Sequence, residues 1–420
     1  MGFASPYLKK HAFFDPFILH PVAERTGIIV VIPCYNEPGL LRSVNSLAAA
    51  SMPSFPVEVI VTLNVPENAP SGAFEQNRRT LEQLDEWCRE NNRAGFTVRS
   101  INVPPFPVKY AGAGFARKTG MDEAVRRFSM SGNPQGIIVS FDADSLCESN
   151  YFTELERCFA SGEINGCTIY FEHPDEDQNV EYYKAIVDYE LYLRYYVQAM
   201  RFAGFPWAFH TVGSCFAVNA RVYADQGGMN RRKAGEDFYF LHKMFPLGRF
   251  TELNTTMVMP SSRVSDRVPF GTGAAMKKLS GNQGKPLMTW PPDSFDDLSV
   301  LFSSLPGLFN ASEPEIFRIS ALFPELLRGY LEKNRFADNI VQVNMNSASY
   351  PAFRKRFFRW FGGLMILKYL NFARRNGRED IPVTAASAGL LSRMGITAQE
   401  GARGLLGRFR RLQRETVWRC

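Results

Sequence analysis

GIIVVIPCYNEPG, residues 27–39, is the stretch that decides the fold of the N-terminal half of the chain. It begins with an uninterrupted apolar run rich in β-branched residues, which is typical of a strand buried on both faces of a parallel sheet. Pro33 bounds this run, and residues 40–51 (LLRSVNSLAAAS) predict a helix that ends before Pro53. The segment therefore predicts a strand and a helix joined by a polar turn.

The same alternation of strands and helices continues to residue 144. Further strands are predicted at 57–64, 96–103 and 136–144, and further helices at about 73–93 and 117–128. Strands and helices alternate at intervals of roughly thirty residues. This spacing predicts βαβ crossovers and hence a doubly wound, mostly parallel α/β sheet flanked by helices. Ligands of such sheets bind beyond the carboxyl ends of the strands. The polar residues at those ends are Asn36, Glu37, Asn64, Asp142 and Asp144.

The rest of the chain is predicted to be mainly helical. Helices are expected at about 175–203 and at 235–244, and only helical segments follow residue 286. We therefore predict an N-terminal extension at 1–26, a catalytic domain at 27–285 and a helical C-terminal region at 286–420.

Composition narrows the class of protein. Hydrophobic residues make up 45% and charged residues 21% of the chain, an ordinary globular balance. The 48 basic and 42 acidic residues leave a net charge of +6, too small and too dispersed to indicate nucleic-acid binding. This charge does fit an anionic ligand or an acidic membrane surface.

Targeting and redox signals are sparse. The seven cysteines form no CxxC pair, as expected for reduced thiols in the cytoplasm. The N-terminus lacks the features of a signal peptide, and no apolar run reaches the roughly 18 residues needed to span a bilayer. We expect a cytoplasmic protein, with peripheral contact to the inner face of the membrane left open.

Asp142 and Asp144 directly follow an apolar strand. Side chains at i and i+2 of an extended chain face the same side, so both carboxylates are expected to point toward one cation. Mg²⁺ and Mn²⁺ take oxygen ligands and share them with substrate phosphates. The alternative is that the two aspartates cap the next helix. Their position at the end of a strand favours the metal site.

Glu236 and Asp237 lie at the start of a predicted helix, in the sequence GEDF (235–238). Acidic residues at this position also suit the helix macrodipole, which would be a structural role. The functional interpretation makes Asp237 a general base that deprotonates an acceptor hydroxyl, with Glu236 as its catalytic neighbour.

The segment GAGFARKTG (112–120) is glycine-rich and basic, and it opens a helix. Its third glycine falls too late for the GxGxxG pattern, which argues against a dinucleotide fold. Gly114, Arg117 and Lys118 are candidates to hold a phosphate or nucleotide. A glycine-rich turn followed by a solvated basic helix face is the alternative.

Taken in order, the elements IPCYNEPG, GAGFARKTG, SFDADS and GEDF resemble the family-2 glycosyltransferases of the GT-A fold, over roughly residues 27–245. The resemblance implies transfer of a sugar from a nucleoside-diphosphate donor with a divalent cation, Mn²⁺ or Mg²⁺. It also implies that the first loop contacts the nucleotide base and ribose. The matching residues of that loop are Pro33, Tyr35, Asn36 and Glu37.

The resemblance implies roles for the later elements as well. Arg117 matches an arginine near the nucleotide, with Lys118 in place of the more usual asparagine. Asp144 is the implied direct metal ligand of the Asp142–Asp144 pair. Asp237 matches the catalytic base of inverting members. Residues 210–230, which include Gly213 and Ser214, match the segment that lines the acceptor and donor-sugar pocket.

The chain also departs from the family pattern. The second strand ends in LNVPEN rather than in an aspartate pair, so Asn64 or Glu67 must hold the base or it is held differently. No QxxRW motif and no membrane helices follow residue 237, which disfavours a processive polysaccharide synthase. Residues 261–273 follow instead, and their Arg263 and Arg267 are predicted to close on the diphosphate, with a plain surface loop as the alternative.

Aromatic and histidine residues supply weaker candidates. His242, His210 and His173 are candidates for a further metal ligand, although a buried structural role is the favoured interpretation of each. Trp207 is the candidate for stacking on a sugar. The segments 352–375 and 403–419 mix apolar and basic residues, which suits either contact with a membrane surface or a helix packed on the protein.

The predicted mechanism is a single displacement in which Asp237 accepts the acceptor proton. The acceptor is a sugar, a glycan or a lipid-linked molecule. A nucleotidyltransferase of similar architecture is an alternative, but it would carry a glycine-rich loop where this chain has CYNEPG. A catalytically inactive carbohydrate-binding or scaffold protein is the other alternative, although Asp142, Asp144 and Asp237 are all present.

Overall fold

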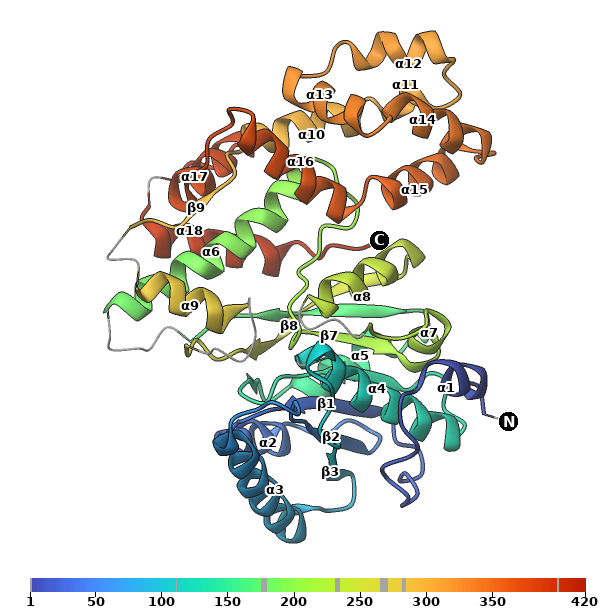
Figure 1. Cartoon of the computed structure of the whole chain (residues 1–420), viewed down its shortest axis with the longest axis vertical. Helices are drawn as coiled ribbons and strands as arrows, with labels where there is room; N and C mark the ends of the chain where they lie inside the picture. Colours follow the sequence, from blue (N-terminus) through green and yellow to red (C-terminus); the bar gives the residue numbers. More distant parts are fainter. Residues whose placement is uncertain are drawn as a thin grey trace. The chain divides into compact units, whose positions relative to one another are not determined.

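The chain forms two compact units. The structure, a computed structural model, describes residues 2–110, 112–174, 180–230, 235–264, 271–281, 285–398 and 400–420. Unit 1 consists of Met1–Ile186, Thr211–Gly281 and Arg414–Cys420, and unit 2 consists of Val187–His210 and Asn282–Gln413. Figure 1 labels their helices and several of their strands.

An eight-stranded sheet forms the centre of unit 1, in the order β3-β2-β1-β4-β7-β6-β8-β5. Its strands are β1 (Ile28–Cys34), β2 (Val57–Leu63), β3 (Phe96–Asn102), β4 (Ile137–Ser140), β5 (Leu146–Cys147), β6 (Gly166–Phe171), β7 (Phe216–Asn219) and β8 (Phe250–Met259). The first four strands are parallel, as are β6 and β8, whereas β7 runs antiparallel to both of its neighbours. Ile28 to Ile32 of β1 are fully buried, because strands inside a parallel sheet are covered on both faces.

Helices flank this sheet, and α4 packs against β1 and β2. The helices of unit 1 are α1 (Ser5–His11), α2 (Leu40–Ala49), α3 (Ser71–Asn91), α4 (Ala113–Met130), α5 (Tyr151–Phe159), α7 (Ala220–Asp225), α8 (Glu236–Met244) and α9 (Thr272–Ser280), with 3₁₀ turns η1 (Val108–Tyr110) and η2 (Phe245–Leu247). The helix α6 (Val180–Phe202) begins in unit 1 and continues into unit 2.

The strand order places a topological switch point between β1 and β4. From β1 the chain proceeds outward to β2 and β3, and then returns to place β4 on the other side of β1. The backbone N–H of Phe141 donates to the Val31 carbonyl at 3.1 Å, which keeps the two strands paired to their carboxyl ends. Ligands of open α/β sheets bind at such a point, so the loops that follow β1 and β4 are the ones to examine.

Unit 2 is mainly helical. It contains α10 (Asp293–Ser303), α11 (Leu305–Leu308), α12 (Glu313–Ser320), α13 (Glu325–Lys333), α14 (Phe336–Met345), α15 (Tyr350–Trp360), α16 (Gly363–Arg375), α17 (Val383–Arg393), most of α18 (Ala402–Glu415) and the short pair β9 (Met288–Thr289) and β10 (Ile381–Pro382). Its core is aromatic, with Phe302 within ring-contact distance of Phe357, Phe358 and Phe361.

The basic C-terminal segments have their aromatic side chains inside the protein. In α15, Phe353, Phe357 and Phe358 are buried while the four basic residues Arg354, Lys355, Arg356 and Arg359 are exposed. None of the described helices combines the length and the apolarity required to cross a bilayer. Beyond α18, the chain end pairs with β8, where Phe250 and Cys420 exchange two backbone hydrogen bonds.

The predicted fold class is confirmed: the protein has a mostly parallel α/β sheet flanked by helices, followed by a helical C-terminal region. Two details differ from the sequence prediction. The strand predicted at 136–144 ends at Ser140, so Asp142 and Asp144 lie beyond it in a turn. The second unit begins at Asn282 but also includes Val187–His210, a segment that the sequence prediction placed in the catalytic domain.

Candidate functional site

Arg117 is the centre of a buried polar cluster at the carboxyl end of β4. Its Nη1 atom donates to Ser140 Oγ at 2.6 Å and to the Gly213 carbonyl at 3.0 Å. Its Nη2 atom donates to Asp142 Oδ1 at 3.0 Å, and its Nε atom donates to Glu236 Oε1 at 3.3 Å. The guanidinium therefore joins four chain segments, although its side chain is only 3% exposed.

The topology explains why these segments meet. Arg117 lies in α4, which covers β1 and β2 next to β4. The antiparallel pairing of β4 with β7 places Ser140 opposite Phe216. Gly213 lies three residues before Phe216 and is thereby brought to the end of β4, where its carbonyl accepts a hydrogen bond from Ser140 Oγ. A Cβ atom added to Gly213 would lie 2.8 Å from Arg117 Nη2 and 3.2 Å from Asp237 Oδ2. A residue without a side chain is therefore needed for this close approach.

Asp142 and Asp144 have different arginine partners. The Ser145 N–H donates to the Asp142 carbonyl at 3.1 Å, so the chain turns directly after β4. Asp142 pairs with Arg117, whereas Asp144 Oδ2 lies 3.0 Å from Arg263 Nη2. The expectation that the two carboxylates share one cation, which allowed for a turn at the end of the strand, stays a prediction. Neither aspartate caps a helix, because α5 begins only at Tyr151.

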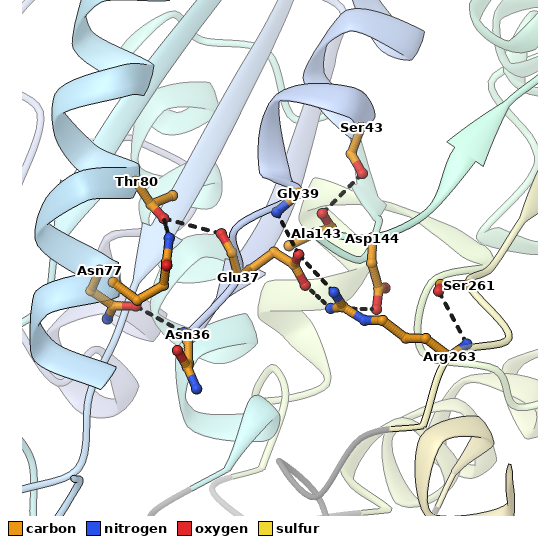
Figure 2. A network of polar contacts seen from close by, with 11 residues as sticks. Asn36, Glu37, Gly39, Ser43, Asn77, Thr80, Ala143, Asp144, Ser261 and Arg263 are labelled. Carbon is orange, nitrogen blue, oxygen red and sulfur yellow. Dashed lines mark hydrogen bonds and ion pairs between the residues drawn. The ribbon is translucent and has the colours of Figure 1, made fainter. Parts of the chain in front are cut away.

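Arg263 also binds Glu37, as Figure 2 shows. Its Nη1 atom donates to Glu37 Oε1 at 3.0 Å, and its Nη2 atom contacts Glu37 Oε2 as well as Asp144. Glu37 is completely buried, and its Oε1 also accepts the Gly39 N–H at 2.7 Å. A single guanidinium thus lies between the loop after β1 and the loop after β4.

The loop after β1 is held by α3 (Figure 2). Asn77 Oδ1 accepts the backbone N–H of Asn36 at 2.8 Å, and Thr80 Oγ1 donates to the Glu37 carbonyl at 3.0 Å. Asn36 itself is exposed and has a φ of 49°, a conformation that Asn tolerates better than most residues. Sequence reasoning missed Asn77 and Thr80. Both lie on the buried stripe of α3, and polar residues on such a stripe are the signal that could have identified them.

Asp237 lies beside this cluster at the start of α8. Loss of solvent around its carboxylate raises its pKa to about 7, and the negative charge of Glu236 contributes, while Arg117 and the Phe238 N–H oppose the shift. The pKa of Arg117 is itself raised, because the charges of Asp142, Glu236 and Asp237 outweigh the lowering caused by burial. Asp237 can therefore exchange a proton near neutral pH.

Lys118 lies outside this cluster. Its Nζ atom donates to Asp122 Oδ2 at 2.7 Å and to Tyr7 Oη at 3.2 Å, and all three side chains are buried. Successive helix residues point about 100° apart, so Arg117 and Lys118 cannot face the same neighbours. The predicted alternative of a solvated basic helix face does not hold for either residue. Gly114 is also buried, in the first turn of α4.

The other predicted residues of unit 1 lie at or near the same strand ends. Pro33 and Tyr35 are partly exposed at the end of β1. Asn64 follows β2 and is 4% exposed, and its carbonyl accepts Asn77 Nδ2 at 2.9 Å. Ser214 is fully buried, with its Oγ 3.2 Å from Cys215 Sγ. Arg267 lies outside the described residues.

The aromatic candidate Trp207 and the three histidine candidates have contacts with neighbouring residues of the protein. Trp207 is 7% exposed and packs against Phe205 and Phe358 within unit 2. His210 is buried in the same unit, and burial together with neighbouring arginines lowers its pKa. In unit 1, His173 Nε2 lies 3.2 Å from Thr272 Oγ1, and His242 Nδ1 lies 2.9 Å from the Phe238 carbonyl.

Metal binding can be tested against the described side chains. Within the ranges that the structure describes, no three His, Cys, Asp or Glu side chains are grouped so as to hold a metal ion. Magnesium and manganese sites often need only one or two carboxylates, because substrate phosphates and waters supply the other ligands. The guanidinium between Glu37 and Asp144 shows that this pair accommodates a positive charge.

Comparison with known proteins yields likenesses to solved structures at low sequence identity. No protein-family model matches the chain, and no curated protein matches it. Among solved structures, it is similar to the crystal structure of S. aureus TarS 1-349 in complex with UDP-GlcNAc, at 13% identity over 80% of this chain and 91% of that chain, with a TM-score of 0.42. It is also similar to GalNAc-T7 with UDP, GalNAc and Mn²⁺, at 13% identity over 71% and 55% of the two chains, with a TM-score of 0.37.

Proposed function

We propose that the protein is a glycosyltransferase that moves a sugar from a nucleoside-diphosphate donor to an acceptor hydroxyl. One observation carries the proposal: Arg117 connects Asp142, in the turn after β4, with the Glu236–Asp237 pair at the start of α8. The cluster lies beside the switch point of the sheet, where open α/β proteins bind their ligands. Three of the four motifs of the family resemblance contribute residues to this cluster, which supports the proposal.

Asp237 is the proposed general base. A base works best when its pKa lies near the working pH, because it is then deprotonated and still accepts a proton. The raised pKa of Asp237, about 7, meets this requirement. We assign a single displacement with inversion, because Asp237 is given the role of base and no residue is assigned as a nucleophile.

The nucleotide would lie across the strand ends, against Asn36 and the loop after β1. Asp144 would hold a divalent cation together with a second carboxylate, which is Asp142 in the sequence prediction. When bound, such a cation neutralises negative charge on the diphosphate leaving group. The acceptor is a sugar, a glycan or a lipid-linked molecule.

The proposal is tested by incubating the purified protein with a panel of nucleotide sugars in the presence of Mn²⁺. We expect one donor to raise the unfolding temperature, since a ligand at 100 times its Kd stabilises by about 2.7 kcal/mol. The same donor should be hydrolysed slowly, and Asp237→Asn should bind it without hydrolysing it. Absence of binding by every donor would contradict the proposal.

Two further measurements separate the two alternative functions from the proposed one. A nucleotidyltransferase would release pyrophosphate from a nucleoside triphosphate mixed with a sugar phosphate. An inactive carbohydrate-binding protein would bind a donor or glycan and leave it intact over the whole incubation.

A further inference from the structure

The guanidinium of Arg263 occupies the position of a cation between two carboxylates. It makes a two-pronged contact with Glu37 and a second contact, at 3.0 Å, with Asp144 (Figure 2). Planar guanidinium groups match carboxylates in this way and form strong charge-assisted hydrogen bonds. The positive charge neutralises Glu37, whose side chain is completely buried.

The two carboxylates that share this charge come from the two sides of the switch point. Glu37 follows β1 and is held by the Gly39 N–H and by Thr80. Asp144 follows β4, and the turn that carries it is fixed by Ser43 of α2, whose Oγ donates to the Ala143 carbonyl at 2.9 Å. The backbone at both positions is therefore held by contacts other than those with Arg263.

Asp142 is placed differently. It is held by Arg117, which has a further buried partner in Glu236 and is 3% exposed. Arg263 is 37% exposed and belongs to the segment after β8, outside any helix or strand. Of the two arginines that contact the Asp142–Asp144 pair, the more exposed Arg263 is the better placed to be exchanged for another cation.

We propose that Glu37 and Asp144 form the cation-binding pair of this site, and that Arg263 fills it until a divalent cation displaces the guanidinium. The inference deepens the proposed function and rests on it. It can nevertheless be tested without any donor. Arg263 then acts as an internal competitor that lowers the affinity of the ligand-free protein for the metal. Its removal leaves a buried carboxylate that needs a new positive charge.

The test is a titration of the full chain with Mn²⁺ in the absence of nucleotide. Binding is measured from the EPR signal of the free Mn²⁺. We expect Arg263→Gln to bind Mn²⁺ at least tenfold more tightly than the wild type, which corresponds to about 1.4 kcal/mol. In the Arg263→Gln background, Glu37→Gln and Asp144→Asn should each remove the gain, whereas Asp142→Asn should retain it to within about threefold. Arg79→Gln, which breaks an exposed ion pair with Glu75, is the matched control and should bind Mn²⁺ as the wild type does.

Each outcome decides the inference. It is overturned if Arg263→Gln binds Mn²⁺ no better than the wild type, whether both bind or neither does. It is also overturned if Asp142→Asn removes the gain as completely as Asp144→Asn. The Asp142 and Asp144 comparison remains decisive even where Glu37→Gln, at a buried position, fails to fold. A protein that hydrolyses a donor but fails this test keeps its proposed function and loses only the role of Glu37 and Arg263.

Discussion

Arg117 Nη2 lies 3.0 Å from Asp142 Oδ1, and the side chain of Arg117 is 3% exposed whereas that of Asp142 is 37% exposed. An arginine that the sequence assigned to the nucleotide is thus bound to Asp142, the first carboxylate of the Asp142–Asp144 pair. Because Arg117 also binds Glu236, it connects the turn after β4 with the start of α8, where the proposed base Asp237 lies.

Removal of Arg117 is expected to reduce stability strongly. Arg117→Ala leaves the buried carboxylate of Glu236 without its partner, which typically costs about 3–5 kcal/mol. Arg117→Lys should lose part of this, since an ammonium group cannot reproduce a planar fork with several partners. Urea unfolding measures both, and Arg79→Ala at an exposed ion pair should cost below about 1 kcal/mol. An unchanged free energy of unfolding in Arg117→Ala would show that Arg117 does not stabilise the cluster.

The raised pKa of Asp237 predicts a pH-dependent gain in stability from Asp237→Asn. A carboxyl whose folded pKa lies above its unfolded value loses stability as pH rises between the two values, here from about 4 to about 7. Asparagine has no such ionisation. We expect Asp237→Asn to be more stable than the wild type by about 1–3 kcal/mol at pH 8 and nearly equal to it at about pH 3, below the unfolded pKa. Equal stability of the two proteins at pH 8 would indicate an ordinary carboxyl pKa.

Gly213→Ala is expected to disturb the cluster through space alone. The new methyl group would lie 2.8 Å from Arg117 Nη2, so the guanidinium or the backbone must shift. Such overpacking costs about 1–3 kcal/mol, and the rate of donor hydrolysis should fall as well. Gly72→Ala, where an added Cβ meets nothing within 4 Å, is the matched control. Wild-type stability and hydrolysis in Gly213→Ala would argue against this close approach.

Lys118 is expected to act through stability and not through donor binding. Lys118→Met leaves Asp122 buried without its ammonium partner, a loss of about 3–5 kcal/mol. Adding Asp122→Asn should recover part of that loss, because the uncompensated charge is then gone. Thermal unfolding and donor titration measure the two effects separately. A large loss of donor affinity with unchanged stability would restore the sequence assignment of Lys118.

The aromatic residues of α15 are expected to stabilise unit 2 and not to enter a bilayer. Phe357→Ala should cost about 3–5 kcal/mol because Phe357 is fully buried, whereas Phe317→Ala, at a side chain that is 56% exposed, should have little effect. For the same reason, the wild type should not sediment with zwitterionic vesicles. Binding to such vesicles would show that these phenylalanines leave the core.

Much of the fold was predictable because its signals are local. The apolar run of β1, the break at its end and the alternation of strands with helices up to residue 144 each reflect a preference that a short stretch of chain expresses by itself. The polar residues after β1 and β4 were predictable for the same reason, since the carboxyl ends of parallel strands meet at one edge of the sheet. Asn77 and Thr80 could have been found as polar residues on an otherwise buried helix stripe.

The pairing of charges was decided only by the tertiary structure. Sequence alone determined that Glu37, Asp142, Asp144, Arg117 and Arg263 belong to this protein's candidate site, and it could not determine which carboxylate meets which arginine. That choice depends on the turn after Ser140, on the antiparallel β7 and on the segment that follows β8, which are contacts between residues far apart in the chain. Electrostatic partners form wherever the packed backbone brings opposite charges within a few ångströms, and local sequence carries no record of that distance.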